Sequence, residues 1–223
     1  MAEAGDPLMA DQAYDRLIAV LRDGRLGSGQ FVSMPGLVDL IDLPIAATRE
    51  AVKRANVNGL VEVLPKRGVL VMEASAAATR DCMDLRAMLD QEGARRLVAA
   101  SRGTGGVGLP LAELRASHEA LIVDAEREMT ADLPARAVLT DLSLHDALAT
   151  GLANPFAAEA YRVNRDRISV IQNTRPFLPD RIVPAMREHL AIIDALERAD
   201  VAATVAAIAE HYRLTLRWWG ILL

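Results

Sequence analysis

From residue 75 to the end of the chain, apolar side chains recur at the spacing of amphipathic helices, and no stretch alternates as a strand would. Glycine, proline and asparagine interrupt this pattern at short intervals. The predicted helices are Ala76–Ala100, Leu111–Glu128, Pro134–Thr150, Pro155–Gln172, Asp180–Ala199 and Val201–Trp218. Helices joined by short loops pack antiparallel, and the interior of such a bundle can hold a metal ion or a small ligand. The pattern therefore predicts an all-α antiparallel bundle over residues 75–223.

Residues 8–73 show a different order of elements. The predicted elements are helices over Leu8–Asp23, from Ser33 to Ile41 and over Pro44–Asn58, then strands over Leu60–Leu64 and Val69–Met72. Ser33 is a favourable N-cap for the second helix, and Gly59 can end the third in the left-handed conformation. Helices followed by a two-stranded ribbon predict a winged helix-turn-helix domain. The chain is thus predicted to be mainly α, with this domain ahead of the bundle.

Basic side chains gather on the third helix and on the loop between the strands, although the whole chain has a net charge of -5. The candidate DNA-binding residues are Arg49, Lys53 and Arg54 on the helix and Lys66, Arg67 and Gly68 on the loop. Cations placed in this way can neutralise phosphates, and a glycine lets the backbone come close to a groove. Taken alone, the same charges would also suit a solvated face of a protein that binds no DNA.

The composition limits the cellular setting. Cys82 is the only cysteine, so the chain can form no internal disulfide and no cysteine-based zinc site. Met1–Pro7 lacks the basic and apolar regions of a signal peptide, and the longest apolar stretch, Val201–Ala209, is much too short to span a membrane. We therefore expect a cytoplasmic protein with no membrane partner.

Short motifs in both halves resemble the FadR-type branch of the GntR superfamily of transcriptional regulators. In the winged-helix half they are Ala13–Ile18, Asp23–Leu26, Thr48–Val52, Asn58–Val61 and Pro65–Val71. In the helical half, motifs that resemble the metal-binding branch of the FCD effector domain are Leu85-Arg86, Asp141–His145, Asn154-Pro155, Glu188-His189 and Asp200–His211. The resemblance implies a DNA-binding regulator and not an enzyme, and release of a repressor from DNA is the usual pattern of this family.

One segment departs from the family pattern. The third helix of relatives usually begins with a Ser-Arg-Thr-Pro-like stretch, whereas this chain has Pro44-Ile45-Ala46-Ala47. Ile45 therefore stands where an arginine would reach a base edge. Ile45 or the two alanines could contact a thymine methyl group, or phosphate contacts and DNA shape could carry more of the recognition. The operator sequence of relatives is therefore not transferred to this chain.

Four side chains of the helical half are candidate metal ligands: Asp141, His145, His189 and His211. Asp141 and His145 are four residues apart, so they share one face of a helix and can bind one ion together. His189 and His211 lie within the last two predicted helices among apolar neighbours. Three imidazoles and a carboxylate suit a divalent transition metal such as zinc, nickel, manganese or iron. Each histidine taken singly could also be an ordinary core or surface residue, and the family resemblance favours the set.

A bound metal would leave coordination positions for a small carboxylate, and an arginine can pair with such an effector. We expect Arg86, on an otherwise apolar helix, to bind it, and Asn173 to be a further pocket residue. Arg86 could instead form a salt bridge, and Asn173 could simply end its helix. His118 is expected to face solvent, and Glu188 and Glu210 are expected on solvated faces.

The chain ends in an apolar segment that includes Trp218, Trp219 and Ile221–Leu223. Because such a tail is unfavourable in solvent, we expect it to pack on the bundle or on a second copy of the chain. A symmetric dimer would place two DNA-binding heads on the half-sites of a palindromic operator. The prediction is therefore a dimeric transcription regulator that responds to a small carboxylate. The alternatives are a metalloenzyme that uses the Asp/His set and a DNA-binding protein whose bundle only dimerises.

Overall fold

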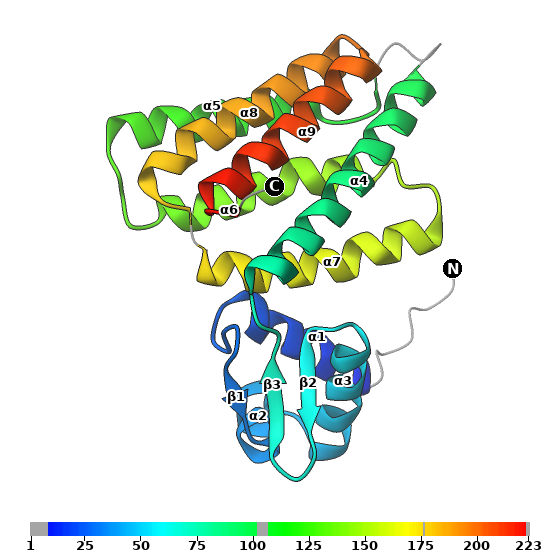
Figure 1. The fold of residues 1–223 in the computed structure, drawn as a ribbon, viewed down its shortest axis with the longest axis vertical. Coiled ribbons are helices and arrows are strands. Elements are labelled where there is room, and N and C mark those ends of the chain that lie inside the picture. Colours follow the sequence, from blue (N-terminus) through cyan, green and yellow to red (C-terminus); the bar gives the residue numbers. More distant parts are fainter. Residues whose placement is uncertain (1–8, 102–106, 176, 222–223) are drawn as a thin grey trace, which may run out of the picture. The chain divides into compact units, whose positions relative to one another are not determined.

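A computed structural model describes residues 9–101, 107–175 and 177–221 (Figure 1). In chain order the elements are α1 (Met9–Arg22), β1 (Phe31–Val32), α2 (Met34–Ile41), α3 (Ile45–Val57), β2 (Val61–Leu64), β3 (Gly68–Val71), α4 (Ala76–Ser101), α5 (Leu111–Arg127), α6 (Leu133–Ala149), α7 (Pro155–Thr174), α8 (Pro179–Glu197) and α9 (Val201–Trp218). This order confirms the predicted fold class, a winged helix-turn-helix ahead of a helical bundle. Leu8, most of the glycine-rich break after residue 102, and residues 222–223 of the apolar tail lie outside the described residues.

The chain forms two compact units that do not meet at a single boundary in the sequence. The first contains the residues up to Thr79 together with Arg165–Thr174. The second contains Arg80–Asn164 together with the residues from Arg175 onward. The sequence predicts a division between residues 73 and 75, whereas the structure assigns the second half of α7 to the winged-helix unit.

The core of the first unit lies between its helices and its sheet. Its buried residues include Leu17, Leu21, Leu37, Ala51, Leu60 and Val69. The side chain of Ser33 accepts a hydrogen bond from the backbone nitrogen of Gly36 (3.2 Å), as an N-cap of α2 should. Gly59 follows α3 with a φ of +67°, the left-handed conformation that its position predicts. Capping therefore explains where α2 begins and where α3 ends.

The predicted ribbon is part of a three-stranded antiparallel sheet with the order β1-β3-β2. The sequence does not predict β1, because two residues are too few to show an alternating pattern. Gly68 begins β3 with a φ of +144°, and a Cβ atom there would collide with the backbone oxygen of Val32 in β1. Gly68 is buried in the sheet, and close packing of the strands explains why a glycine is needed there. Its contact with DNA stays a prediction.

Polar contacts hold the second half of α7 in the first unit. Arg167 donates from Nε and Nη2 to the backbone oxygen of Asn58 (2.9 and 2.7 Å), beside the turn that follows α3. Arg22 at the end of α1 donates from Nε to Oδ1 of Asp166 (3.0 Å). Val170 adds an apolar side chain to the core of this unit. These contacts explain why residues 165–174 belong with the winged helix.

Asn173 belongs to the same contact region. Its side-chain amide donates to the backbone oxygens of Leu21 (2.8 Å) and Arg22 (3.2 Å). The last carbonyl groups of a helix have no partners within that helix, so this amide satisfies the C-terminal end of α1. The amide of Asn173 is thus engaged within the winged-helix unit, and its role in an effector pocket stays a prediction.

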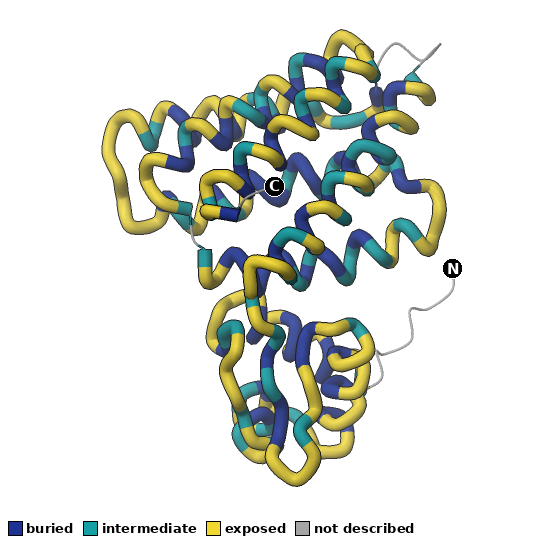
Figure 2. Tube along the Cα trace, viewed as in Figure 1, coloured by how far each residue is buried: buried dark blue, intermediate teal, exposed yellow. Residues whose placement is uncertain are grey.

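The second unit is a bundle in which α5, α8 and α9 lie side by side and α6 packs against α5 and α8 (Figure 1). A cluster of buried residues lies between α5, α6 and α8: Leu121, Leu133, Ala137, Ile182 and Met186. The helices bury one side and expose the other, as their amphipathic pattern predicts (Figure 2). Within the described ranges, no helix is both long enough and apolar enough to cross a membrane.

A glycine contact brings α4 close to the end of α6. A Cβ atom on Gly93 would collide with the backbone oxygen of Leu148, and one on Gly151 would collide with the backbone oxygen of Gly93. The absence of side chains at these positions therefore permits the approach. Asp90 and Arg86 lie about one and two turns before Gly93 on the same helix. The crossing thus brings both side chains next to α6.

Candidate metal centre

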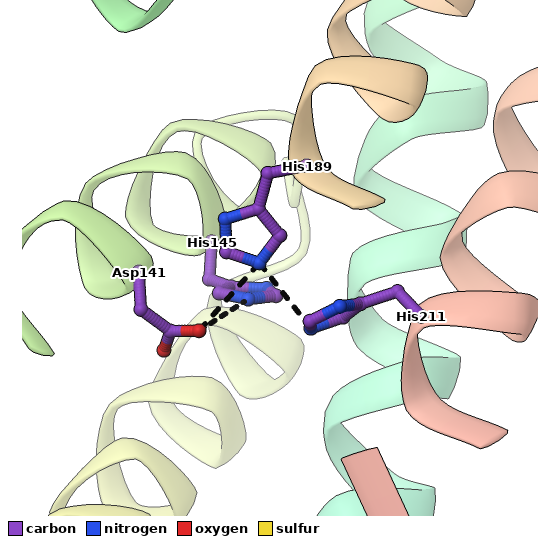
Figure 3. Close-up of side chains that lie close together, drawn as sticks. All are labelled: Asp141, His145, His189 and His211. Atoms are coloured by element: carbon purple, nitrogen blue, oxygen red, sulfur yellow. Dashed lines mark hydrogen bonds and ion pairs between the residues drawn. The ribbon is translucent and has the colours of Figure 1, made fainter. Parts of the chain in front are cut away.

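Asp141 and His145 of α6, His189 of α8 and His211 of α9 meet inside the second unit (Figure 3). One possible ligand atom from each residue lies within 4.8 Å of the corresponding atoms of the others. All four side chains are buried. The fold therefore brings together all four residues that the sequence indicates as candidate metal ligands.

The distances between these atoms fit a single divalent ion. His189 Nε2 lies 3.3 Å from His211 Nε2 and 3.5 Å from Asp141 Oδ1, and His145 Nε2 lies 3.8 Å from the same oxygen. Ligands bound to a tetrahedral zinc ion are about 3.3 Å from one another, because each lies about 2.0 Å from the metal. The nitrogen and oxygen donors present here could therefore hold such an ion after a small contraction.

One buried atom of the cluster lacks a partner. Among the described residues, His145 Nε2 has no hydrogen-bond partner, and its side chain is only 1% exposed. A buried polar atom without a partner is costly, and coordination of an ion would satisfy it. The donor set therefore fits a metal both by its chemistry and by this unsatisfied nitrogen.

Two carboxylates hold the outer nitrogens of the histidine rings. His145 Nδ1 lies 2.6 Å from Asp90 Oδ2, and His211 Nδ1 lies 2.8 Å from Glu188 Oε2. Burial opposes the ionisation of Glu188, but hydrogen bonds from Arg181 and His211 outweigh that effect and lower its pKa. Because an ionised carboxylate only accepts, His211 donates through Nδ1 to Glu188 and presents the lone pair of Nε2 to the cluster. His145 has the same orientation when Asp90 is ionised and accepts from its Nδ1.

Asp90 is the centre of a buried polar network between α4, α6 and α9. The hydroxyl of Tyr212 donates to Asp90 Oδ2 (2.6 Å), and burial holds the pKa of Tyr212 well above its usual range. Burial also raises the pKa of Asp90 to about 7, against the opposing effect of Arg86. Arg86 Nε lies 3.9 Å from Asp90 Oδ2, and its Nη2 donates to Oδ2 of Asp141 (3.2 Å). Arg86 thus lies beside a candidate ligand and also forms the salt bridge that the sequence left open.

The expectation that His118 faces solvent is wrong. His118 is 0% exposed, and its Nε2 lies 3.0 Å from His189 Nδ1. Its Nδ1 lies 2.6 Å from the backbone oxygen of Leu114. Because His118 has charged neighbours in the sequence, the sequence predicts an exposed position for it. In the structure, however, α5 packs against α8 along the face that carries His118. All four histidines of the chain therefore lie in or beside the cluster.

The surroundings of Glu188 and Asp90 depend on how the helices pack, so the periodicity of a single helix does not predict them. Glu188 is expected on a solvated face, but its carboxylate binds both His211 and the guanidinium of Arg181. Glu210 is exposed, as expected. No motif in the sequence singles out Asp90, although its position four residues after Arg86 puts both side chains on one face of α4.

The basic residues of α3 have different surroundings. Lys53 forms an ion pair with Glu50 on the same helix (2.7 Å). The guanidinium of Arg54 lies over the ring of Tyr14, 4.0 Å from its centroid, so this arginine packs on α1. Arg49 is exposed, and the described part of the chain shows no ion pair for it. Arg49 is therefore the residue of this helix best placed to contact a ligand outside the chain.

The loop between β2 and β3 presents two cations. Lys66 and Arg67 are both exposed. Lys66 has a φ of +62°, and the backbone nitrogen of Arg67 donates to the oxygen of Leu64 (3.0 Å). A positive φ at the third position with Pro65 before it forms a type II turn, where glycine is more usual. The turn thus keeps both cationic side chains at the tip of the wing.

Comparisons with known proteins agree with this architecture. The model of the FCD domain family matches residues 81–214. The solved structure of McbR/YncC of E. coli superposes with a TM-score of 0.73 at 17% identity, covering 96% of this chain and 97% of that one. A putative GntR transcriptional regulator from Rhodococcus sp. RHA1 gives a TM-score of 0.71 at 17% identity, covering 96% and 99%. At this identity the structures show the shared fold, and no curated protein matches the sequence.

Proposed function

Because the chain belongs to the FCD domain family, we propose that it is a DNA-binding transcription regulator of the GntR type, controlled by a ligand at a metal site. One observation carries the proposal. Four predicted ligands converge in a buried position of a chain whose other unit is a winged helix with exposed cations. A regulator needs both a sensing site and a DNA-binding head, whereas an enzyme needs only the first. We therefore propose no catalytic reaction for the site.

Asp141, His145, His189 and His211 would hold the ion. When bound, a divalent zinc, nickel, manganese or iron ion supplies positive charge and coordination positions for a ligand. The carboxylates of Asp90 and Glu188 would keep the rings of His145 and His211 oriented. No cysteine lies in this set, and a mixed nitrogen and oxygen set is compatible with each of these metals.

The charges around the site favour an anionic effector. Asp90, Asp141 and Glu188 are acidic, and Arg86 and Arg181 are basic. A divalent ion turns the net charge of this group from −1 to +1 when Asp90 is ionised, and from 0 to +2 when Asp90 is protonated. A small carboxylate would neutralise that charge, and Arg86 is the cation placed to pair with it beside Asp141. We therefore propose a small organic acid as the effector class.

The winged-helix unit would bind the operator through Arg49 on α3 and through Lys66 and Arg67 at the wing. Lys53 and Arg54 would contribute charge near the phosphates, although their heads are engaged with Glu50 and with α1. We propose a homodimer on a palindromic operator, acting as a cytoplasmic repressor. The effector would change DNA affinity through α7, because that helix supplies residues to both units.

A binding experiment tests this proposal. Protein purified without chelator is analysed for metal, and its preferred duplex is selected from random DNA. Affinity for that duplex is then measured with and without each member of a panel of small carboxylates. We expect one metal per chain and a carboxylate that weakens DNA binding at least tenfold. His189→Ala should lose the metal and the carboxylate response while keeping basal DNA affinity, and Glu210→Gln is the exposed control. A metal content undiminished in His189→Ala would refute the ligand assignment.

A further inference from the structure

We infer that His118 is a positioning residue of the metal centre, which fixes His189 in the tautomer whose Nε2 lone pair faces the other ligands. The inference deepens the proposed function and rests on its metal site. Its core is a chain of hydrogen bonds that runs from a backbone carbonyl on α5, through one imidazole, to a second imidazole on α8. Each link in that chain dictates the next.

The first link is the contact between His118 and the backbone of its own helix. His118 Nδ1 lies 2.6 Å from the oxygen of Leu114. A carbonyl oxygen only accepts, so His118 Nδ1 carries a proton and donates. His118 is 0% exposed, and burial disfavours the charged form of an imidazole. In a neutral ring with a proton on Nδ1, the other nitrogen, Nε2, is an acceptor.

The second link passes this constraint to the candidate ligand. His118 Nε2 lies 3.0 Å from His189 Nδ1, so His189 donates through Nδ1. Its Nε2 then carries no proton in the neutral ring, and that is the atom 3.5 Å from Asp141 Oδ1 and 3.3 Å from His211 Nε2. The nitrogen that faces the cluster is thus the one with a free lone pair.

The same tautomer is imposed on the other two histidines by a different chemistry. The acceptor is a carboxylate for two of the rings, because His145 donates to Asp90 and His211 donates to Glu188. The acceptor for His189 is the neutral imidazole of His118. An acid at position 118 would bring a further negative charge into the interior at a cost in desolvation, whereas an imidazole orders His189 without adding charge.

Loss of the acceptor at position 118 would have a specific consequence. The Nδ1–H group of His189 would then be buried without a hydrogen-bond partner. The other tautomer, with the proton on Nε2, would be favoured instead, because Nε2–H can donate to Asp141 Oδ1. That proton would occupy the direction in which the ion binds. Removal of such an outer hydrogen-bond partner typically lowers metal affinity about 10–100-fold. His118 therefore acts on the ion only through His189, and it is not itself one of the four candidate ligands.

The direct test uses the full-length wild-type protein freed of metal by a chelator and labelled with ¹⁵N in its histidines. Two-bond ¹H–¹⁵N NMR correlations distinguish a protonated ring nitrogen from one with a lone pair. We expect His118 and His189 both to carry their proton on Nδ1 and to leave Nε2 unprotonated. A proton on Nε2 of either ring would overturn the inference. Because no metal is needed, this result is independent of whether the proposed metal site is correct.

Variants provide the second test. In His118→Gln, the side-chain amide can place an oxygen near the position of Nε2 and still accept from His189. His118→Phe keeps a flat ring and removes the acceptor. We expect His118→Phe to bind Zn²⁺ and Co²⁺ about 10–100-fold more weakly, with a proton on His189 Nε2. His118→Gln should recover most of the lost affinity, and Glu119→Gln, on the exposed side of α5, should match the wild type.

The outcomes divide cleanly. Wild-type metal affinity in His118→Phe, or an unchanged His189 tautomer in that variant, would overturn the inference. So would a His118→Gln protein that folds as the wild type but binds metal as weakly as His118→Phe. If His118→Phe does not fold, the tautomers of the metal-free wild type and the affinity of His118→Gln decide the question.

Discussion

Oδ2 of Asp90 lies 2.6 Å from Nδ1 of His145, so a carboxylate of α4 holds an imidazole of α6. Tyr212 of α9 donates to the same oxygen at 2.6 Å. One atom of Asp90 therefore ties together three helices around the candidate centre. The consequence is that α4, which supplies no predicted ligand, determines the orientation of one.

We predict that Asp90→Asn weakens Zn²⁺ binding about tenfold or more, because an amide is a poorer acceptor for His145 than a carboxylate and adds a donor that no neighbour needs. Competition against a chromophoric chelator measures this affinity. Asp84→Asn, an exposed change on the same helix, is the matched control and should bind as the wild type. Equal affinities for the two variants would show that Asp90 does not support the site.

We predict that Gly93→Ala reduces the free energy of unfolding by about 1–3 kcal/mol, a typical cost of overpacking. A Cβ atom at this position meets the backbone of α6, which cannot rotate away as a side chain could. Since the displaced helix carries Asp90, metal affinity should fall as well. Chemical denaturation and a Zn²⁺ titration measure the two effects, and Ala99→Ser, an exposed position on α4, is the control. A stable variant with wild-type metal binding would contradict the close crossing of α4 and α6.

We predict that Arg49→Ala lowers operator affinity by about 1–3 kcal/mol if the guanidinium reads a base. Arg49 is exposed and has no ion pair within the described residues, so its loss removes no internal contact. Fluorescence anisotropy with the selected duplex measures the effect, and Arg187→Ala on the helical unit is the control. Unchanged affinity in Arg49→Ala would show that the arginine points away from DNA.

Lys66→Ala should weaken binding to all duplexes alike and reduce the salt dependence of that binding, as expected for a phosphate contact.

The sequence predicts the helices and the ligand set because both depend on short-range patterns. Glycine and proline mark the helix ends, and the spacing of Asp141 and His145 places them on one face of α6 without knowledge of any other helix. The positions of Asp90, Glu188 and His118 depend on which helices pack together, and that information is absent from the periodicity of a single helix. Charged neighbours in the sequence therefore indicate the wrong surroundings for His118. For Glu188 the same error comes from its position, about 100° round the helix from His189.

The assignment of residues 165–174 to the winged-helix unit is a second relationship between distant parts of the sequence. Helical periodicity continues without a break through α7, so no pattern indicates that its two halves belong to different units. Asn173 shows the difficulty clearly. Its place before a proline is typical of a helix end, and its contacts with Leu21 and Arg22 appear only in the folded chain.

We predict that Asn173→Ala destabilises the winged-helix unit without changing metal affinity. The substitution leaves the backbone oxygens of Leu21 and Arg22 without their side-chain donor, and loss of such hydrogen bonds costs about 1 kcal/mol. Hydrogen exchange at the C-terminal end of α1 should rise, while the Zn²⁺ titration should match the wild type because no residue of the cluster is altered. If α7 carries the effector response, the carboxylate should also change DNA affinity less in this variant than in Glu159→Gln, an exposed control on the first half of the same helix. A full carboxylate response together with faster exchange in α1 would show that these contacts only stabilise the winged helix and that the response takes another route.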